Sequence, residues 1–109
     1  MSDKLKKGQL VSIKIGNLVY TPDGFSNGSQ YIDGKICLYE EIDLFSFPSF
    51  NDFYGRKIFV QDGDIATVSK FVGRPNQISQ DPKWFSYDVY EILIHGTFMK
   101  IFRHNLSTL

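Results

Sequence analysis

The chain has 109 residues, of which 42% are hydrophobic and 16% aromatic, and its 12 basic and 12 acidic residues cancel to a formal net charge of zero. A chain of this size forms one domain, here residues 1–109, with enough apolar material for a core. The balanced charge lacks the basic footprint that is typical of nucleic-acid-binding domains. The single cysteine, Cys37, excludes an intrachain disulfide and a thiolate metal cage.

Strands are favoured over helices, because alanine occurs only once whereas Ile, Val, Phe and Tyr are plentiful. Residues 1–7 are polar and are predicted to form a flexible arm, without the apolar stretch of a signal peptide. Residues 8–20 alternate apolar and polar side chains, which predicts a half-buried strand, and residues 35–42 predict a second strand. Between them, residues 21–34 contain one proline and three glycines and are predicted to form a long surface loop.

Residues 43–55, DLFSFPSFNDFYG, are unusually aromatic. Ser49 after a proline resembles a helix start and Gly55 resembles a stop, so one helical turn is predicted over residues 49–54. Two interpretations of this segment remain open. It plugs the core or covers the last hairpin, or it forms an aromatic docking surface for another chain.

The second half of the chain predicts two hairpins. Asp62-Gly63 is a pair typical of tight turns and lies at the centre of a hairpin predicted over residues 57–73. Residues 74–84 contain two prolines and are predicted to be a loop. A second hairpin follows over residues 87–106. Short strands with no intervening long helix favour a small barrel or sandwich.

A two-residue turn is predicted at His95-Gly96, and such a turn determines the register of the last hairpin. Glu91 then lies opposite Lys100, and Asp88 lies opposite Arg103. Burying the Glu91–Lys100 pair in a dry core would carry a large desolvation cost, so its face is predicted to point outward. The inner face is predicted to comprise Tyr90, Ile92, Ile94, Met99 and Ile101, and the outer face also carries Val89, Leu93, Phe98 and Phe102.

This outer face and the aromatic segment together hold more large apolar side chains than a small barrel interior accommodates. They are therefore predicted to form one apolar surface, part of which binds another protein chain. The predicted interaction surface comprises Phe47, Phe50, Phe53, Leu93, Phe98 and Phe102.

The segments GQLVSI at 8–13 and GDIATV at 63–68, with the last hairpin and Leu106, resemble the SH3-like small barrels, including the ribosomal and transcription-factor type. In such modules a strand opens with glycine, a polar residue and a hydrophobic residue, and a hairpin ends in a short helical turn with a leucine. The resemblance implies a mainly β, small SH3-like barrel of about six strands, with long loops and at most one or two short helical turns. The composition is also similar to that of small tailed-phage proteins.

No catalytic, metal or cofactor site is predicted. The two histidines, His95 and His104, lack the spacing of a metal triad, and no base is placed beside Cys37. The carboxylates at Asp62 and Asp64 are typical of turns. The chain is therefore predicted not to be an enzyme and to need no cofactor.

Two classes of function remain. The first is a non-enzymatic protein-interaction or structural module, a subunit or adaptor whose partner is a second copy or a neighbour in an assembly. The alternative is a nucleic-acid-binding barrel that uses the 70–84 loop and the last hairpin. Its contacts would be Lys70, Arg74, Lys83, Trp84, Lys100 and Arg103. No apolar run is long enough to span a bilayer, so a cytoplasmic location is expected. For a phage-encoded protein, the expected location is the host cytoplasm or the virion.

Overall fold

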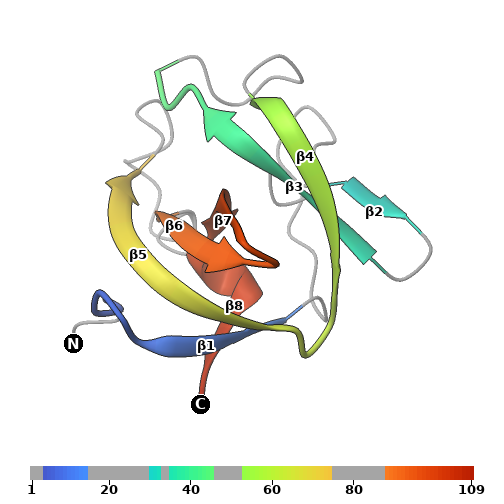
Figure 1. The fold of residues 1–109 in the computed structure, drawn as a ribbon. Coiled ribbons are helices and arrows are strands. Elements are labelled where there is room, and N and C mark those ends of the chain that lie inside the picture. Colours follow the sequence, from blue (N-terminus) through green and yellow to red (C-terminus); the bar gives the residue numbers. More distant parts are fainter. Residues whose placement is uncertain (1–3, 15–29, 33–34, 46–52, 75–87) are drawn as a thin grey trace.

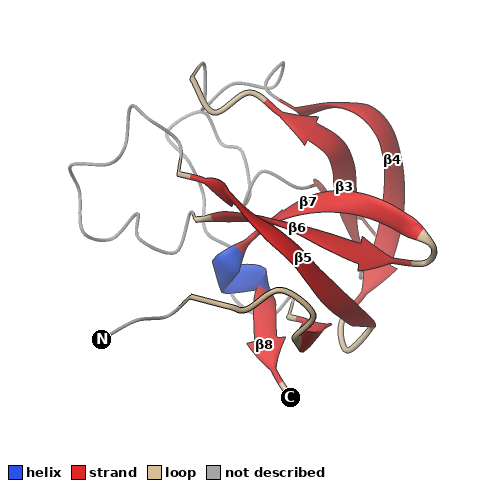
Figure 2. Cartoon of the chain, turned by 60° about the vertical axis from the view of Figure 1, so that its left-hand side comes forward, coloured by secondary structure: helices blue, strands red, loops and turns tan. Residues whose placement is uncertain are grey.

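The computed structural model describes residues 4–14, 30–32, 35–45, 53–74 and 88–109, and these residues form a mainly β structure (Figure 1). The strands are β1 (Leu10–Ile13), β2 (Gln30–Ile32), β3 (Lys35–Ile42), β4 (Phe53–Gln61), β5 (Ile65–Gly73), β6 (Val89–Ile94), β7 (Thr97–Phe102) and β8 (Leu106–Thr108). A 3-10 turn, η4 (Arg103–Asn105), precedes β8 (Figure 2). The prediction of a mainly β, barrel-like fold is confirmed, with more strands in the described residues than the six expected.

All of these strands belong to one sheet, which curls into a half-barrel (Figure 1). The order is β2-β3-β7-β6-β5-β1-β8, and β4 pairs with β3 on the edge that β7 does not use. Each pairing between neighbours is antiparallel. The helical turn before Leu106 returns the chain to β1, so that β8 pairs with β1 from Val11 to Ile13.

The last hairpin has the predicted register. Glu91 is opposite Lys100 in the β6–β7 ladder, and the backbone amide of Arg103 donates to the carbonyl of Asp88 at 2.7 Å, one step beyond the ladder. His95 and Gly96 both adopt positive φ, 51° and 76°, as a primed two-residue turn requires. The carboxylate of Asp88 is ion-paired with Arg74 at 2.8 Å.

The inner face of this hairpin is also confirmed, and it forms the centre of the core. Its five predicted residues are all buried. They pack in one cluster with side chains from the other strands: Val11, Ile13, Ile36, Leu38, Val60, Ala66, Val68 and Leu106. The strand alternation that assigned these faces therefore decides where the core lies.

The prediction of a hairpin over residues 57–73 is wrong. The turn at Asp62-Gly63 exists, but β4 pairs with β3, whereas β5 pairs with β1 and β6. Asp64 stabilises the turn with two hydrogen bonds to the backbone of Gln61. Its carboxylate accepts one from the backbone amide of Gln61 at 2.9 Å, and its own backbone amide donates one to the backbone carbonyl of Gln61 at 3.1 Å. The Gly63 amide donates to the Ile13 carbonyl at 2.7 Å, so the turn is a corner against the end of β1.

Three smaller predictions need correction. Residues 53–54 belong to β4 rather than to a helical turn, and residues 49–52 lie outside the described part of the chain. Of the strand predicted over residues 8–20, the structure shows β1 and places residues 8, 9 and 14 outside it, and residues 15–20 lie outside the described part of the chain. Residues 4–7 do not form a free arm: Leu5 packs on the core, its amide donates to the Tyr90 hydroxyl at 3.1 Å, and the Lys4 ammonium lies 4.8 Å from the centre of the Phe71 ring.

The alternation of faces in β6 makes a direct mutational test. Ile92→Ala should lower the free energy of unfolding by about 2–5 kcal/mol, because it leaves a cavity in the core. The neighbouring Leu93→Ala removes a side chain that is 40% exposed and should cost about 1 kcal/mol or less. Urea denaturation of both variants measures the difference, and equal losses would contradict the assigned faces.

Candidate interaction surface

A transverse row of side chains crosses the outer face of four neighbouring strands. Leu10 is opposite Thr67, Thr67 is opposite Leu93, and Leu93 is opposite Phe98. Leu10, Leu93 and Phe98 are 53%, 40% and 51% exposed. Because paired strands lie about 4.8 Å apart, this outer row extends for roughly 15 Å. We call these four residues the outer row.

Two further exposed residues extend the outer row. Ile65 lies two positions before Thr67 on the same face of β5, opposite Ser12. Leu109 follows Thr108, which is opposite Val11, so the next step of the same antiparallel register places Leu109 opposite Leu10. Sequence reasoning found Leu93 and Phe98 but missed Leu10 and Ile65, because the row is assembled by pairings between strands far apart in the sequence.

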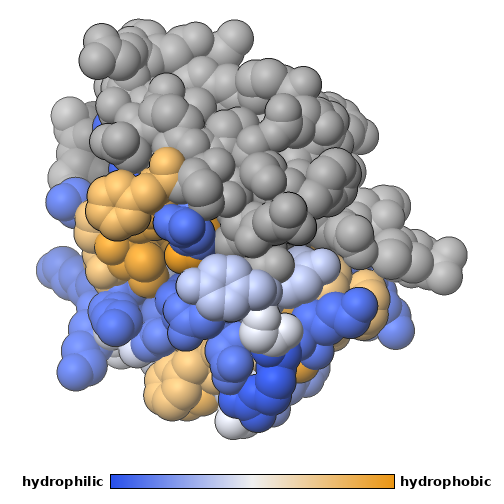
Figure 3. Space-filling model, turned by 90° about the horizontal axis from the view of Figure 1, so that it is seen from above, coloured by the Kyte–Doolittle hydropathy of each residue, from blue (hydrophilic) through white to orange (hydrophobic). Residues whose placement is uncertain are grey.

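Charges lie on one side of the outer row. The next rung of the sheet pairs Lys70 with Glu91 and Glu91 with Lys100. On the other side, Ile65 is opposite Ser12 and Ser12 is opposite Ser107. The outer row is therefore bordered on one side by a charged rung and on the other by a rung that combines Ile65 with two serines. Viewed from above, the described residues show hydrophobic and hydrophilic side chains intermixed (Figure 3).

The prediction that Phe102 belongs to the exposed surface is wrong. Phe102 is only 2% exposed, and its neighbour across the ladder, Val89, is also buried. The ring of His104 stacks on Phe102, with centroids 5.8 Å apart. The outer face of the hairpin is thus open near the turn and covered at its far end, a difference that alternation alone does not reveal.

The aromatic segment falls largely outside the described residues, and with it the predicted contacts Phe47 and Phe50. Phe53 begins β4 opposite Ile42, but its side chain is not described. Of the other aromatic residues on this part of the chain, Phe45 and Tyr54 are exposed. The two interpretations of this segment, plug or docking surface, both stay predictions.

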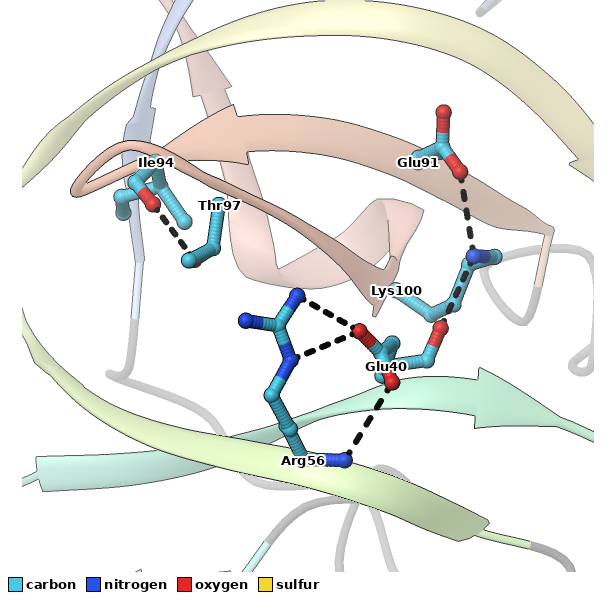
Figure 4. A network of polar contacts seen from close by, with 6 residues as sticks. All are labelled: Glu40, Arg56, Glu91, Ile94, Thr97 and Lys100. Atoms are coloured by element: carbon cyan, nitrogen blue, oxygen red, sulfur yellow. Dashed lines mark hydrogen bonds and ion pairs between the residues drawn. The ribbon is translucent and has the colours of Figure 1, made fainter.

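A set of polar contacts lies beside the outer row, and we call it the polar bracket: it comprises Ser69, Glu91, Lys100 and Glu40. The Lys100 ammonium donates to the Glu91 carboxylate at 3.1 Å and to the backbone carbonyl of Glu40 at 2.9 Å (Figure 4). The Ser69 hydroxyl also donates to the Glu91 carboxylate, at 2.8 Å. The side chains of Lys100 and Glu91 are only 10% and 16% exposed. The pair lies on the predicted side of the hairpin, but it is largely enclosed rather than solvated.

A bulge in β4 adds a second ion pair to this bracket. Gly55 and Arg56 together lie opposite Glu40, and Gly55 has a φ of 88°. A Cβ atom at Gly55 would lie 2.9 Å from the Cβ atom of Glu40, so glycine is required there. The bulge aims Arg56 at the Glu40 carboxylate, which it contacts at 2.7 Å (Figure 4). Hydrogen bonds from the Arg56 side chain and backbone amide lower the pKa of Glu40.

The carboxyl pKa of Glu91 reflects opposing effects. Burial alone would raise this pKa, but hydrogen bonds from Ser69 and Lys100 and the positive charges of Lys100 and Lys70 outweigh burial and lower it. Glu91 is therefore held as a carboxylate in a poorly hydrated place. Its charge is balanced chiefly by Lys100, which makes the two side chains interdependent.

The predicted nucleic-acid contacts are not gathered on one basic patch in the described structure. Lys83 and Trp84 lie outside the described residues. Arg74 is ion-paired with Asp88, Lys100 is enclosed in the polar bracket, and Arg103 donates to the carbonyl of Leu106 at 2.7 Å. Lys70 is exposed, on the charged rung beside the outer row.

Other chemistry has little support. Burial raises the pKa of the Cys37 thiol, despite a hydrogen bond with Tyr39 and the charge of Lys57, so the residue favours the unreactive thiol. Among the described side chains, no group of three or more His, Cys, Asp and Glu residues is placed to hold a metal ion. In the same parts of the chain, no helix has the length and apolarity that a membrane crossing requires.

The chain matches no protein-family model, and neither a curated protein nor a solved structure shows significant similarity to it.

The enclosed lysine should be important for stability. Lys100→Met keeps the apolar stem but leaves Glu91 and the Glu40 carbonyl without their ammonium partner, so we expect a loss of about 1–3 kcal/mol in the free energy of unfolding. The exposed Lys70→Met should change it by less than about 0.5 kcal/mol. Chemical denaturation of both variants tests this prediction. If Lys100→Met lowered the free energy of unfolding as little as Lys70→Met, the proposed role of the polar bracket in stability would be wrong.

The lowered pKa of Glu91 predicts a pH dependence. A carboxyl whose pKa is lower in the folded state stabilises the fold above its unfolded pKa, about 4.3, and loses this contribution as the pH falls through the folded pKa. The advantage of the wild type over Glu91→Gln should thus be full at neutral pH and shrink in acid. Urea denaturation across this range tests the sign. An advantage that grows in acid would refute it.

Proposed function

We propose that the protein is a non-enzymatic protein-interaction or structural module, a subunit or adaptor, and that its outer row binds an apolar, uncharged part of another protein. The observation that carries this proposal is the alignment of Leu10, Leu93 and Phe98, each about half exposed, on adjacent strands of one sheet. Single exposed apolar residues are common, but a contiguous row of them is typical of an interaction site.

The surroundings of the row fit this function. The centres of protein interfaces are depleted in charge and their rims are polar. Here the exposed side chain of Lys70, on the rung next to the outer row, lies beside the apolar centre. Because the row is on paired strands rather than on a loop, little conformational entropy is lost when a partner binds.

The order of the strands supports the SH3-like interpretation. A meander of β5, β6 and β7 is followed by the helical turn and by β8, which returns to β1. In such a fold the strands β2, β3 and β4 are an addition between β1 and β5.

Nucleic-acid binding has less support as a function. In the described residues, Arg74, Lys100 and Arg103 already donate to groups of the protein itself, and a phosphate would have to compete with those groups.

The experiment is to replace the row without touching the core. Leu93→Ser combined with Phe98→Ser should leave the protein folded, and it should weaken the complex with a partner captured by the wild type by about 30-fold or more, since each anchor contributes on the order of 1 kcal/mol. Lys70→Ser, on the neighbouring rung, is the matched control and should bind almost normally. Affinities are measured by calorimetry at low and high salt.

Two outcomes would contradict the proposal. The first is a folded double variant that keeps every association of the wild type. The second is a wild type that binds single-stranded polynucleotides with an affinity that falls steeply as salt is raised, which would favour the alternative.

A further inference from the structure

The part of the sheet that the structure describes has one long edge, which is formed by β4. Within the described residues, β4 pairs with β3 alone, and it has nine residues, whereas β2 and β8 at the ends of the sheet order have three each. Figure 2 shows β4 at the margin of the drawn sheet with β3 on one side of it. Natural proteins commonly keep their edge strands short, because an unpaired edge is a template for another strand.

The hydrogen bonds at the end of β4 show which residues offer backbone groups to that edge. Gln61 is opposite Lys35, yet its amide donates to Asp64 and its carbonyl accepts from Asp64, so both groups face away from β3. Alternate residues of a strand direct these groups to the same side. Phe59 and Lys57 therefore also direct their amide and carbonyl groups away from β3, whereas Ile58 and Val60 bond to it.

This edge is regular only over part of its length. The bulge at Gly55 and Arg56 breaks the ladder at one end, and Asp64 occupies the Gln61 groups at the other. Lys57 and Phe59 are left between them. Their side chains are both exposed, with Phe59 at 42%. A strand that docks here is thus confined to one short stretch.

We infer that β4 pairs antiparallel with β4 of a second copy of this chain, about a two-fold axis at Ile58. In this register Lys57 of each copy lies opposite Phe59 of the other, and the two hydrogen-bonded pairs use all of the amide and carbonyl groups that these residues direct outward. A cation beside an exposed ring is favourable. A two-fold axis at Lys57 would instead bring two lysines together, and an axis at Phe59 would need the Gln61 groups that Asp64 already occupies.

Two substitutions that change the charge at the contact test this pairing. Phe59→Lys places a lysine opposite Lys57 of the other copy and should raise the dimer dissociation constant by about tenfold or more. Adding Lys57→Glu to the same chain converts each contact into a Glu–Lys pair and should restore the wild-type constant. Sedimentation equilibrium measures all three proteins, and Leu93→Ser with Phe98→Ser, on the outer row, should leave the constant unchanged.

A second measurement needs no variant. Amide hydrogen exchange at Lys57 and Phe59 should slow as the protein concentration rises, while exchange at Ile58 and Val60, whose amides bond to β3, should stay constant. The pairing is refuted if the wild type is monomeric up to its solubility limit. It is also refuted if the variant with both Phe59→Lys and Lys57→Glu dimerises no more tightly than Phe59→Lys alone. It is equally refuted if the exchange at Lys57 and Phe59 is independent of concentration.

Discussion

The two halves of the sheet are joined by a short backbone pairing and by the contact between the Lys100 ammonium and the Glu40 carbonyl. The strands fall into two groups, β2, β3 and β4 in one and β5 to β8 with β1 in the other, and β3 meets β7 at a single ladder pair, Tyr39 with Lys100. Just beyond that pair, the lysine side chain spans from β7 to the next residue of β3 while its charge is balanced by Glu91. This side chain thus adds a hydrogen bond to the short backbone pairing, in an enclosed place where an ionic hydrogen bond is strong.

This join gives each proposed surface to a different group of strands. The outer row lies on β1, β5, β6 and β7, and the free edge belongs to β4. The core crosses the join, since Ile36, Leu38 and Val60 pack in the same cluster as Ile92 and Met99. The two surfaces are therefore held in a fixed relative orientation. The two proposals are compatible, because one copy would contact another along the β4 edge while its outer row stayed available for a different partner.

The sequence predicted what short-range geometry decides and failed where distant segments decide. The last hairpin was predictable in register and in its inner face, because a two-residue turn and a period of two determine both. The same reasoning at Asp62-Gly63 found the turn but not the strand partners, which depend on contacts with Ile13 and with β3. Alternation also placed Phe102 and Lys100 on the correct side of the hairpin, but it could not show that this part of the face is covered. The outer row was half visible for the same reason: Leu93 and Phe98 are local neighbours, whereas Leu10 and Ile65 join them only through the β1–β5 pairing.

One extra residue in β4 links the join to the free edge. The bulge at Gly55 and Arg56 lets β4 place two residues against Glu40, which brings the Arg56 guanidinium onto the Glu40 carboxylate. The backbone carbonyl of that same glutamate accepts the hydrogen bond from the Lys100 ammonium. The bulge therefore orients a residue that takes part in the join between β3 and β7. A bulge also interrupts the regular spacing that a docking strand needs. It therefore blocks the first part of the β4 edge and leaves Lys57 to Phe59 as the one regular stretch, so that a single local irregularity both supports the sheet and limits which strand can be added to it.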